Sequence, residues 1–236
     1  MCKELTKTDN YRGISLSSVV AKVYNRMLLN RIRPVLDPLM RTNQNGFRQK
    51  RSTVQQILAL RRLIEGIKEK HLPAVVTFTD FKKAFDSLHR GKMMWILEAY
   101  GIPGPIVQAI GAMYDSTTAK VVSPDGETEL FPLLAGVLQG DTLAPYLFII
   151  ALDYALRREI NGKKEQLGFT VIPRKSRRVD PTMKTDFDFA DDIALVSNLV
   201  EQAQKMLHRV EAECRNVGLR RQRSWLTTLH MPRYKL

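Results

Sequence analysis

Residues 74–80 read Ala-Val-Val-Thr-Phe-Thr-Asp, and residues 187–196 read Phe-Asp-Phe-Ala-Asp-Asp-Ile-Ala-Leu-Val. The first stretch is short, apolar and rich in β-branched residues, which predicts a buried strand that ends at Asp80. In the second stretch, alternating apolar residues precede Asp191 and Asp192 and an apolar run follows them, which predicts a hairpin with the acidic pair at its tip. Carboxylates beside apolar strands are costly unless another group compensates their charge, so these acids are the first candidates for a functional site.

Helical spacing of apolar residues marks most of the remaining chain. The predicted helices span 17–36, 52–71, 82–100, 105–114, 141–156 and 199–217. A further hairpin is predicted over 120–130, where Pro-Asp-Gly marks the turn. Residues 161–185 form the most basic connector, and the residues after Leu219 contain many arginines without a clear pattern.

The charge balance points to a polyanionic partner. The 236 residues contain 37 Lys and Arg against 24 Asp and Glu, a net charge of +13, which favours nucleic acid first and an anionic membrane surface second. The length fits one large domain or two small ones. Two cysteines exclude a disulfide framework and a four-cysteine zinc site, and the four scattered histidines lack metal-ligand spacing.

No apolar run is long enough for a membrane-spanning helix, and the polar first ten residues do not resemble a secretory signal. We therefore expect no membrane partner and a nuclear or cytoplasmic location rather than secretion.

The acids suggest a metal site, although a structural interpretation is also open. Mg²⁺ takes oxygen ligands and is commonly held by one or two carboxylates together with substrate phosphates. Alternatively, Asp80 caps the following helix, and the pair Asp191-Asp192 belongs to a tight turn. Spacing alone does not choose between these interpretations.

Five segments appear in a characteristic order along the chain. They read Tyr-Arg-Gly-Ile-Ser-Leu at 11–16, Asn-Gln-Asn-Gly-Phe-Arg at 43–48, Phe-Thr-Asp-Phe-Lys-Lys-Ala-Phe-Asp-Ser at 78–87, Gly-Val-Leu-Gln-Gly-Asp-Thr-Leu-Ala-Pro at 136–145 and Phe-Ala-Asp-Asp at 189–192. This series resembles the reverse transcriptase domain of non-LTR (LINE-type) retrotransposons, and it covers nearly the whole chain from Tyr11 to Gly218.

The resemblance implies an α+β fold: a right-hand polymerase palm with partial fingers, in which helices back an antiparallel sheet. It implies partial fingers over 1–73, a palm with fingers insertions over 74–218, and a degenerate tail without a thumb over 219–236. It also implies an RNA-directed DNA polymerase that uses an RNA template, a DNA primer and deoxynucleoside triphosphates.

In this family Asp80, Asp191 and Asp192 match the catalytic aspartates, which would hold two Mg²⁺ ions, with Mn²⁺ as a possible substitute. One ion would lower the pKa of the primer 3′-hydroxyl, and the other would hold the triphosphate and its leaving group.

Three further residues match family positions around the incoming nucleotide. Phe85 matches the aromatic residue beneath the sugar, where a ring would exclude a 2′-hydroxyl; the alternative is core packing. Gln139 and Gly140 match a loop against the nascent base pair, where glycine permits close backbone approach. The alternative for this loop is a plain turn before a helix.

The remaining matches concern the triphosphate, the primer end and the template. Arg12 matches a fingers arginine that reaches the triphosphate, where a planar fork of donors suits phosphate; the alternative is a solvated surface arginine. Phe189 and Ala190 would lie beside the primer terminus, or they simply complete the hairpin. Residues 43–48 match a segment near the template, or they form a structured turn.

Two departures from the family pattern lead to a competing hypothesis. Residues 220–225 read Arg-Arg-Gln-Arg-Ser-Trp where the family continues with an Asn and paired lysines. The upstream fingers segment and the thumb are also missing from the sequence, which suggests a truncated copy. The alternatives to a working polymerase are a catalytically inactive nucleic-acid-binding remnant and, with less support, a two-metal nuclease.

Overall fold

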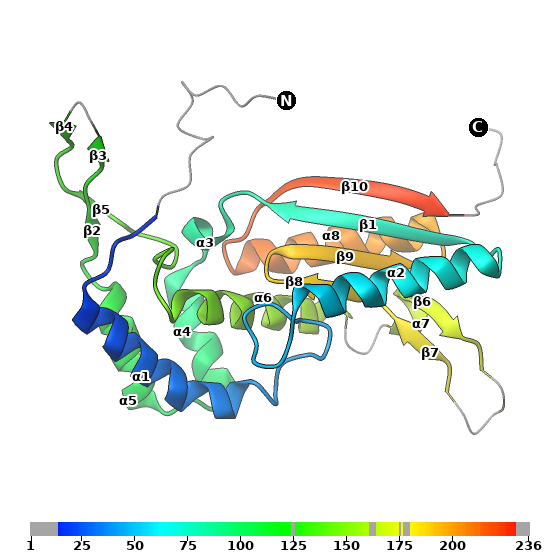
Figure 1. Ribbon diagram of the computed structural model, residues 1–236, viewed down its shortest axis with the longest axis horizontal. Helices are drawn as coiled ribbons and strands as arrows, with labels where there is room; N and C mark the ends of the chain where they lie inside the picture. The colour runs from blue at the N-terminus through cyan, green and yellow to red at the C-terminus, as the bar shows by residue number, and fades with distance from the viewer. Residues whose placement is uncertain (1–13, 124–125, 161–163, 175, 177–179, 230–236) are drawn as a thin grey trace.

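A computed structural model of the chain describes residues 14–123, 126–160, 164–174, 176 and 180–229. The centre of the described part is a four-stranded antiparallel sheet in the order β10-β1-β9-β8 (Figure 1). Its strands are β1 (Ala74–Phe81), β8 (Asp186–Phe189), β9 (Asp192–Ser197) and β10 (Arg221–Leu229). Two helices back this sheet, α6 (Ala144–Ile160) and α8 (Val200–Asn216). The expected α+β architecture with an antiparallel sheet backed by helices is therefore confirmed.

The two faces of the sheet have different surroundings. One face packs against α6 and α8 and contributes side chains to the main core. The paired residues Thr79 and Ile193 lie on this face. On the opposite face Val76 packs with Ile67 of α2 (Thr53–Glu69), which covers one end of the sheet. At the other end of this face Phe78 and Trp225, which are paired in register, are 38% and 54% exposed. The sheet therefore presents an open surface beside Asp80.

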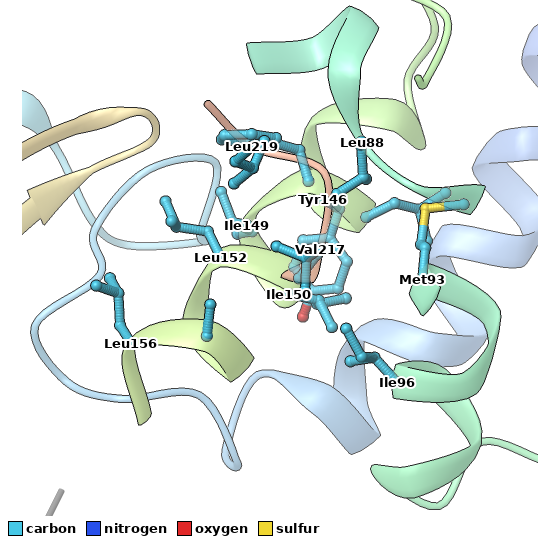
Figure 2. Close-up of a cluster of buried hydrophobic side chains, with 14 of the residues drawn as sticks. Leu88, Met93, Ile96, Tyr146, Ile149, Ile150, Leu152, Leu156, Val217 and Leu219 are labelled. Atoms are coloured by element: carbon cyan, nitrogen blue, oxygen red, sulfur yellow. The ribbon is translucent and has the colours of Figure 1, made fainter. Parts of the chain in front are cut away.

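The main core forms around α6, which is apolar on almost every side. Figure 2 shows side chains of α6 packed against α4 (Arg90–Ala99) and against the chain that follows α8. Buried members of this cluster include Leu88, Met93, Ile96, Tyr146, Ile150, Leu152, Val217 and Leu219. A helix buried on almost every side makes a rigid support for the strands that pack on it.

Apart from α3 (Ala84–Ser87), which is described below, nine further elements complete the described part of the chain. They are α1 (Val19–Leu36), α5 (Gly104–Tyr114), α7 (Lys164–Leu167), β2 (Thr118–Ala119), β3 (Val122–Ser123), β4 (Gly126–Glu127), β5 (Phe131–Pro132), β6 (Phe169–Ile172) and β7 (Thr182–Lys184). The Ser18 hydroxyl caps α1, and Ser52 with Gln55 forms the capping box of α2. None of the helices in the described ranges is long and apolar enough to cross a bilayer.

The helix predicted over 82–100 is wrong as a single element. It is divided into α3 (Ala84–Ser87) and α4, and Lys83 before α3 has a φ of 46°. Between the two helices, the His89 amide donates to the Val217 carbonyl at 2.9 Å and the Leu88 carbonyl accepts from the Gly136 amide at 2.8 Å. These bonds to distant segments replace the intrahelical bonds that a continuous helix requires. The helix predicted over 141–156 also begins later than expected, at Ala144 rather than Asp141.

The patternless tail and the basic connector both contain regular structure. β10 pairs with β1 from Ala74↔Leu229 to Phe81↔Arg221, although its sequence suggested no element. Most of its side chains are exposed because it is an edge strand, so it lacks the alternating apolar signal on which the prediction depends. Within 161–185, β6 and β7 form a hairpin. The Pro-Asp part of the turn predicted near 124 lies outside the described residues.

Candidate active site

The three predicted catalytic acids meet at one end of the sheet. Thr79 pairs with Ile193, so Asp80 and Asp192 are the next residues on their strands at that end. Asp191 lies in the two-residue turn that joins β8 to β9. Asp80 and Asp191 are half-buried, whereas Asp192 is exposed. The structure therefore brings together carboxylates that are more than a hundred residues apart in sequence.

The turn that carries Asp191 has an unusual backbone. Ala190 has a φ of 56°, a left-handed conformation that costs a residue with a Cβ atom about 1 kcal/mol. The buried side chain of Gln44 contacts both polar groups of this residue: its Oε1 accepts from the Ala190 amide at 2.9 Å, and its Nε2 donates to the Ala190 carbonyl at 3.2 Å. The same Oε1 accepts from the Gly46 amide at 2.7 Å. Gln44 therefore links the turn to the loop that follows α1.

This loop lies along β8 like a short additional strand. The Asn45 amide donates to the Asp188 carbonyl at 2.9 Å, and the Asp188 amide donates to the Asn43 carbonyl at 3.1 Å. The Arg48 guanidinium donates to the carbonyls of Arg41 and Gln44 at 2.8 and 3.0 Å. Residues 43–48 thus form a structured turn packed against the hairpin; their predicted place near a template stays a prediction.

A buried ion cluster lies below the same hairpin. Nη2 of Arg41 is 2.8 Å from Asp186 Oδ2 and 2.5 Å from Asp188 Oδ2. The Arg41 amide also donates to Asp153 Oδ1 at 2.9 Å, and Arg157 pairs with Asp153 Oδ2 at 3.1 Å. Such a cluster is strongly destabilised if one partner is removed, because the others are left as uncompensated buried charges.

Burial and the neighbouring charges shift the pKa values in this cluster in opposite directions. Burial raises the pKa of Asp188, and the adjacent Asp186 carboxylate raises it further, to well above its usual range. Burial also tends to raise the pKa of Asp186, but Arg41 and hydrogen bonds outweigh this, so that pKa is lowered. Burial lowers the pKa of Arg41, yet the surrounding carboxylates more than reverse this effect. Of the two adjacent acids, Asp188 is therefore the one that binds a proton more readily.

A cavity of about 360 Å³ opens beside the acids. It is lined by Asp191, Phe85, Gln139 and Gly140, together with Phe47, Phe81, Lys83, Ala84, Asp86 and Pro145. Asp80 and Asp192 are not part of this lining. The cavity thus combines the Asp191 carboxylate of the hairpin turn with aromatic rings and a backbone loop, which suits a flat polar ligand.

Phe85 and the loop at 139–140 have structural roles as well as places in the cavity. The Phe85 ring stacks on Phe148 with centroids 4.7 Å apart and contacts Phe47 edge-on at 6.3 Å. Gly140 has a φ of 111°, and a Cβ atom there would lie 2.5 Å from the Ser15 carbonyl oxygen. The glycine is therefore required by a close backbone approach.

The structure shows less about the other predicted site residues. Phe189, half-buried, pairs with Asp192 across the hairpin, and Ala190 is buried in the turn. Arg12 lies outside the described residues. Sequence reasoning missed Gln44, Arg41 and the buried acids below the hairpin. The alternation of Asp186 and Asp188 within an apolar strand was an available signal, because a strand that points two acids inward needs a buried cation.

A larger cleft of about 1070 Å³ shares Lys83 and Asp86 with the cavity. Its basic lining residues are Lys82, Lys83, Arg90, Arg215, Arg220 and Arg221, and its acidic ones are Asp86 and Glu211. Glu211 already pairs with Arg215 and Arg221. The excess of cations next to the acids is suited to a polyanion.

The carboxylates fit a divalent metal as its partial ligands. Oxygen donors from Asp80, Asp191 and Asp192 belong to the type that Mg²⁺ prefers. No group of three or more His, Cys, Asp or Glu side chains in the described part of the chain is arranged to hold a metal by itself. An ion at this edge would thus need oxygens from water or substrate, as Mg²⁺ commonly does.

The fold and the acidic edge together define a polymerase palm. Residues 3–224 match the family described as reverse transcriptase (RNA-dependent DNA polymerase). The chain belongs to this family.

Its curated relatives are polymerases of non-LTR retrotransposons. The chain is 27% identical over 209 residues to the retrovirus-related Pol polyprotein from type-1 retrotransposable element R2 of Nasonia vitripennis, covering 89% of this chain and 19% of that protein. It is 26% identical over 208 residues to a probable RNA-directed DNA polymerase from transposon BS of Drosophila melanogaster, covering 84% and 21%. The chain thus spans about a fifth of the length of these relatives.

Solved structures support the fold. A telomerase from Candida tropicalis, solved in complex with a fragment of telomeric RNA, matches with a TM-score of 0.62 and 14% identity, covering 89% of this chain and 34% of that one. At this identity the likeness concerns the fold alone. The expected palm fold and the expected family are both confirmed.

Proposed function

We propose that this chain is an RNA-directed DNA polymerase domain that extends a DNA primer on an RNA template by two-metal nucleotidyl transfer. The observation that carries the proposal is the convergence of Asp80, Asp191 and Asp192 at one sheet end beside a cavity lined by Phe85 and Gln139. The family membership and the non-LTR relatives support the same reaction.

Asp80, Asp191 and Asp192 would hold two Mg²⁺ ions, which Mn²⁺ could replace. Bound Mg²⁺ supplies activation of a hydroxyl and neutralisation of phosphate charge. With the ions bound, the carboxylates would orient the primer hydroxyl and the triphosphate for in-line displacement. In this step the 3′-hydroxyl gives up its proton to solvent, its oxygen bonds to the α-phosphorus, and the bond from the α-phosphorus to pyrophosphate breaks.

The cavity residues would act on the nucleotide itself. The Phe85 ring, fixed by its stacking on Phe148, supports the sugar and excludes a 2′-hydroxyl. Gln139 and Gly140 lie against the nascent base pair, and Phe189 with Ala190 lies beside the primer end. By its family match, Arg12 would reach the triphosphate. The open sheet surface at Phe78 and the cationic cleft provide room and charge for the primer and the template.

The domain division and location belong to the same proposal. Residues 1–73 form part of the fingers and 74–218 the palm, and the chain functions in the nucleus or cytoplasm. We also propose that residues 219–236 are a degenerate tail, although the part of this tail that forms β10 is an edge strand of the sheet.

Primer extension on an RNA template, with Mg²⁺ and deoxynucleotides, tests the function. We expect the parent chain to extend the primer and the rate of extension by Asp191→Ala to be at least about a thousandfold lower. Positioning of the substrates alone does not supply the metal ligand that this variant lacks. A soluble, folded parent that binds the hybrid but does not extend it would favour the inactive remnant. Cleavage without any need for deoxynucleotides would favour the nuclease.

A further inference from the structure

We propose that Gln44 is a positioning residue that holds the Ala190-Asp191 turn in its left-handed conformation and thereby orients the Asp191 carboxylate. The inference rests on the proposed function for the role of Asp191, but the contact itself depends only on the structure. Gln44 is not among the residues that line the cavity, so it acts through the turn rather than on a substrate.

The geometry makes Gln44 specific for this turn. A primary amide has both a donor and an acceptor, and Gln44 uses one of each on the same residue, Ala190. Its side chain is fully buried, so water cannot take its place at the turn. Without it, the Ala190 and Gly46 amides would lose their partner in the interior, where an unsatisfied donor is costly.

The packing around Gln44 leaves the turn little alternative room. A Cβ atom at Gly46 would lie 2.3 Å from the Ala190 nitrogen, so the loop approaches the turn as closely as a backbone permits. The loop in turn is fixed by Arg48, whose guanidinium donates to the Gln44 carbonyl and to Asp37 at the end of α1. The position of Asp191 is therefore coupled to the segment that joins α1 and α2.

The chain offers a closely matched control. Gln56 of α2 also makes three hydrogen bonds to this region: it donates to the carbonyls of Asn43 and Asp188 and accepts from the Asn45 side chain. None of the three involves the turn. Gln44→Met and Gln56→Met thus remove the same number of bonds with the same change of side chain, and only the first removes contacts to Ala190.

Amide hydrogen exchange of the full chain measures the contact without any need for activity. In Gln44→Met, we expect the Ala190 amide to exchange about tenfold faster or more, because its acceptor is lost. In Gln56→Met, this amide should keep the parent rate. Gln44→Glu, which keeps the acceptor and loses the donor, should show a smaller acceleration and serves if the Met variant does not fold. Equal Ala190 rates in parent and Gln44 variants would overturn the proposal.

Primer-extension kinetics then test the orienting role. We expect Gln44→Met to lower kcat about 10- to 100-fold and to raise the Mg²⁺ concentration for half-maximal rate, as loss of a supporting contact does at metal sites, with KM for the deoxynucleotide within about twofold. Gln56→Met should leave all three near the parent values. Faster exchange at Ala190 with unchanged kcat and Mg²⁺ dependence would overturn the orienting role of Gln44. An inactive parent would refute the proposed function alone, since the exchange result would still decide whether Gln44 holds the turn.

Discussion

Nη2 of Arg41 lies 2.5 Å from Oδ2 of Asp188, although 147 positions separate the two residues in sequence. Both side chains are buried directly below the hairpin whose tip carries Asp191. The ion pair joins the end of the α1 segment to β8, so the foundation of the candidate active site is built from two distant parts of the chain.

Removing this cation should destabilise the whole fold. Arg41→Met leaves Asp186, Asp188 and Asp153 without their shared partner, and we expect the free energy of unfolding to fall by ~3–5 kcal/mol. Urea unfolding measures this change. Arg61→Met is the control, because the Arg61–Glu65 pair is exposed and screened by solvent, so its removal should change stability little. A loss at Arg41 no larger than at Arg61 would contradict the structural role of the cluster.

The raised pKa of Asp188 predicts an unusual dependence of stability on pH. The folded chain binds this proton more tightly than the unfolded chain does, so the stabilisation is complete below the ordinary aspartate pKa and declines as pH rises through the raised value. Asp186, with a lowered pKa, acts in the opposite sense and only at more acidic pH.

Asp188→Asn should therefore flatten the stability curve above the ordinary aspartate pKa, since the amide mimics the protonated acid and cannot ionise. Above the raised pKa of Asp188 the variant should be more stable than the parent. Urea unfolding at several pH values tests the prediction. Parallel curves for the two proteins would show that Asp188 is ionised in the folded state throughout.

Phe85→Val should relax selection against ribonucleotides. The smaller side chain leaves room for a 2′-hydroxyl in the cavity, so the ratio of kcat/KM for deoxynucleotides to that for ribonucleotides should fall at least about tenfold. Single-nucleotide incorporation on an RNA template gives both constants. Phe148→Leu tests the support instead: this buried residue stacks on Phe85 without lining the cavity, so it should lower the ratio less than Phe85→Val does. An unchanged ratio in Phe85→Val would favour the core-packing interpretation.

Mg²⁺ should stabilise the parent chain through the acidic edge. A ligand that binds only the folded state raises its stability, so millimolar Mg²⁺ together with a deoxynucleoside triphosphate should raise Tm by a few degrees. Asp80→Asn should lose most of this response. In the absence of Mg²⁺, its stability should stay close to that of the parent, because the substitution removes both the repulsion from the neighbouring acids and the cross-strand attraction of Arg223. Thermal unfolding monitored by circular dichroism gives both results, and an equal Mg²⁺ response in the two proteins would refute the predicted metal site.

Local sequence patterns determined most of the elements and the location of the acids. The β-branched run before Asp80 and the alternation before Asp191 predicted β1 and the β8–β9 hairpin, because burial of one strand face imposes a period of two. Ser52 and Gln55 predicted the start of α2, because a cap involves only neighbours in sequence. The order of five motifs sufficed to identify the family.

Tertiary contacts decided the rest, because each depends on groups far apart in the chain. The bonds of Leu88 and His89 to Gly136 and Val217 interrupt a segment whose pattern is helical. β10 exists because β1 offers it an unpaired edge, not because its own residues alternate. The contact of Gln44 with Ala190 has no local signature in the sequence either. The role of a buried side-chain amide can be recognised only when the tertiary structure shows which backbone groups it hydrogen-bonds.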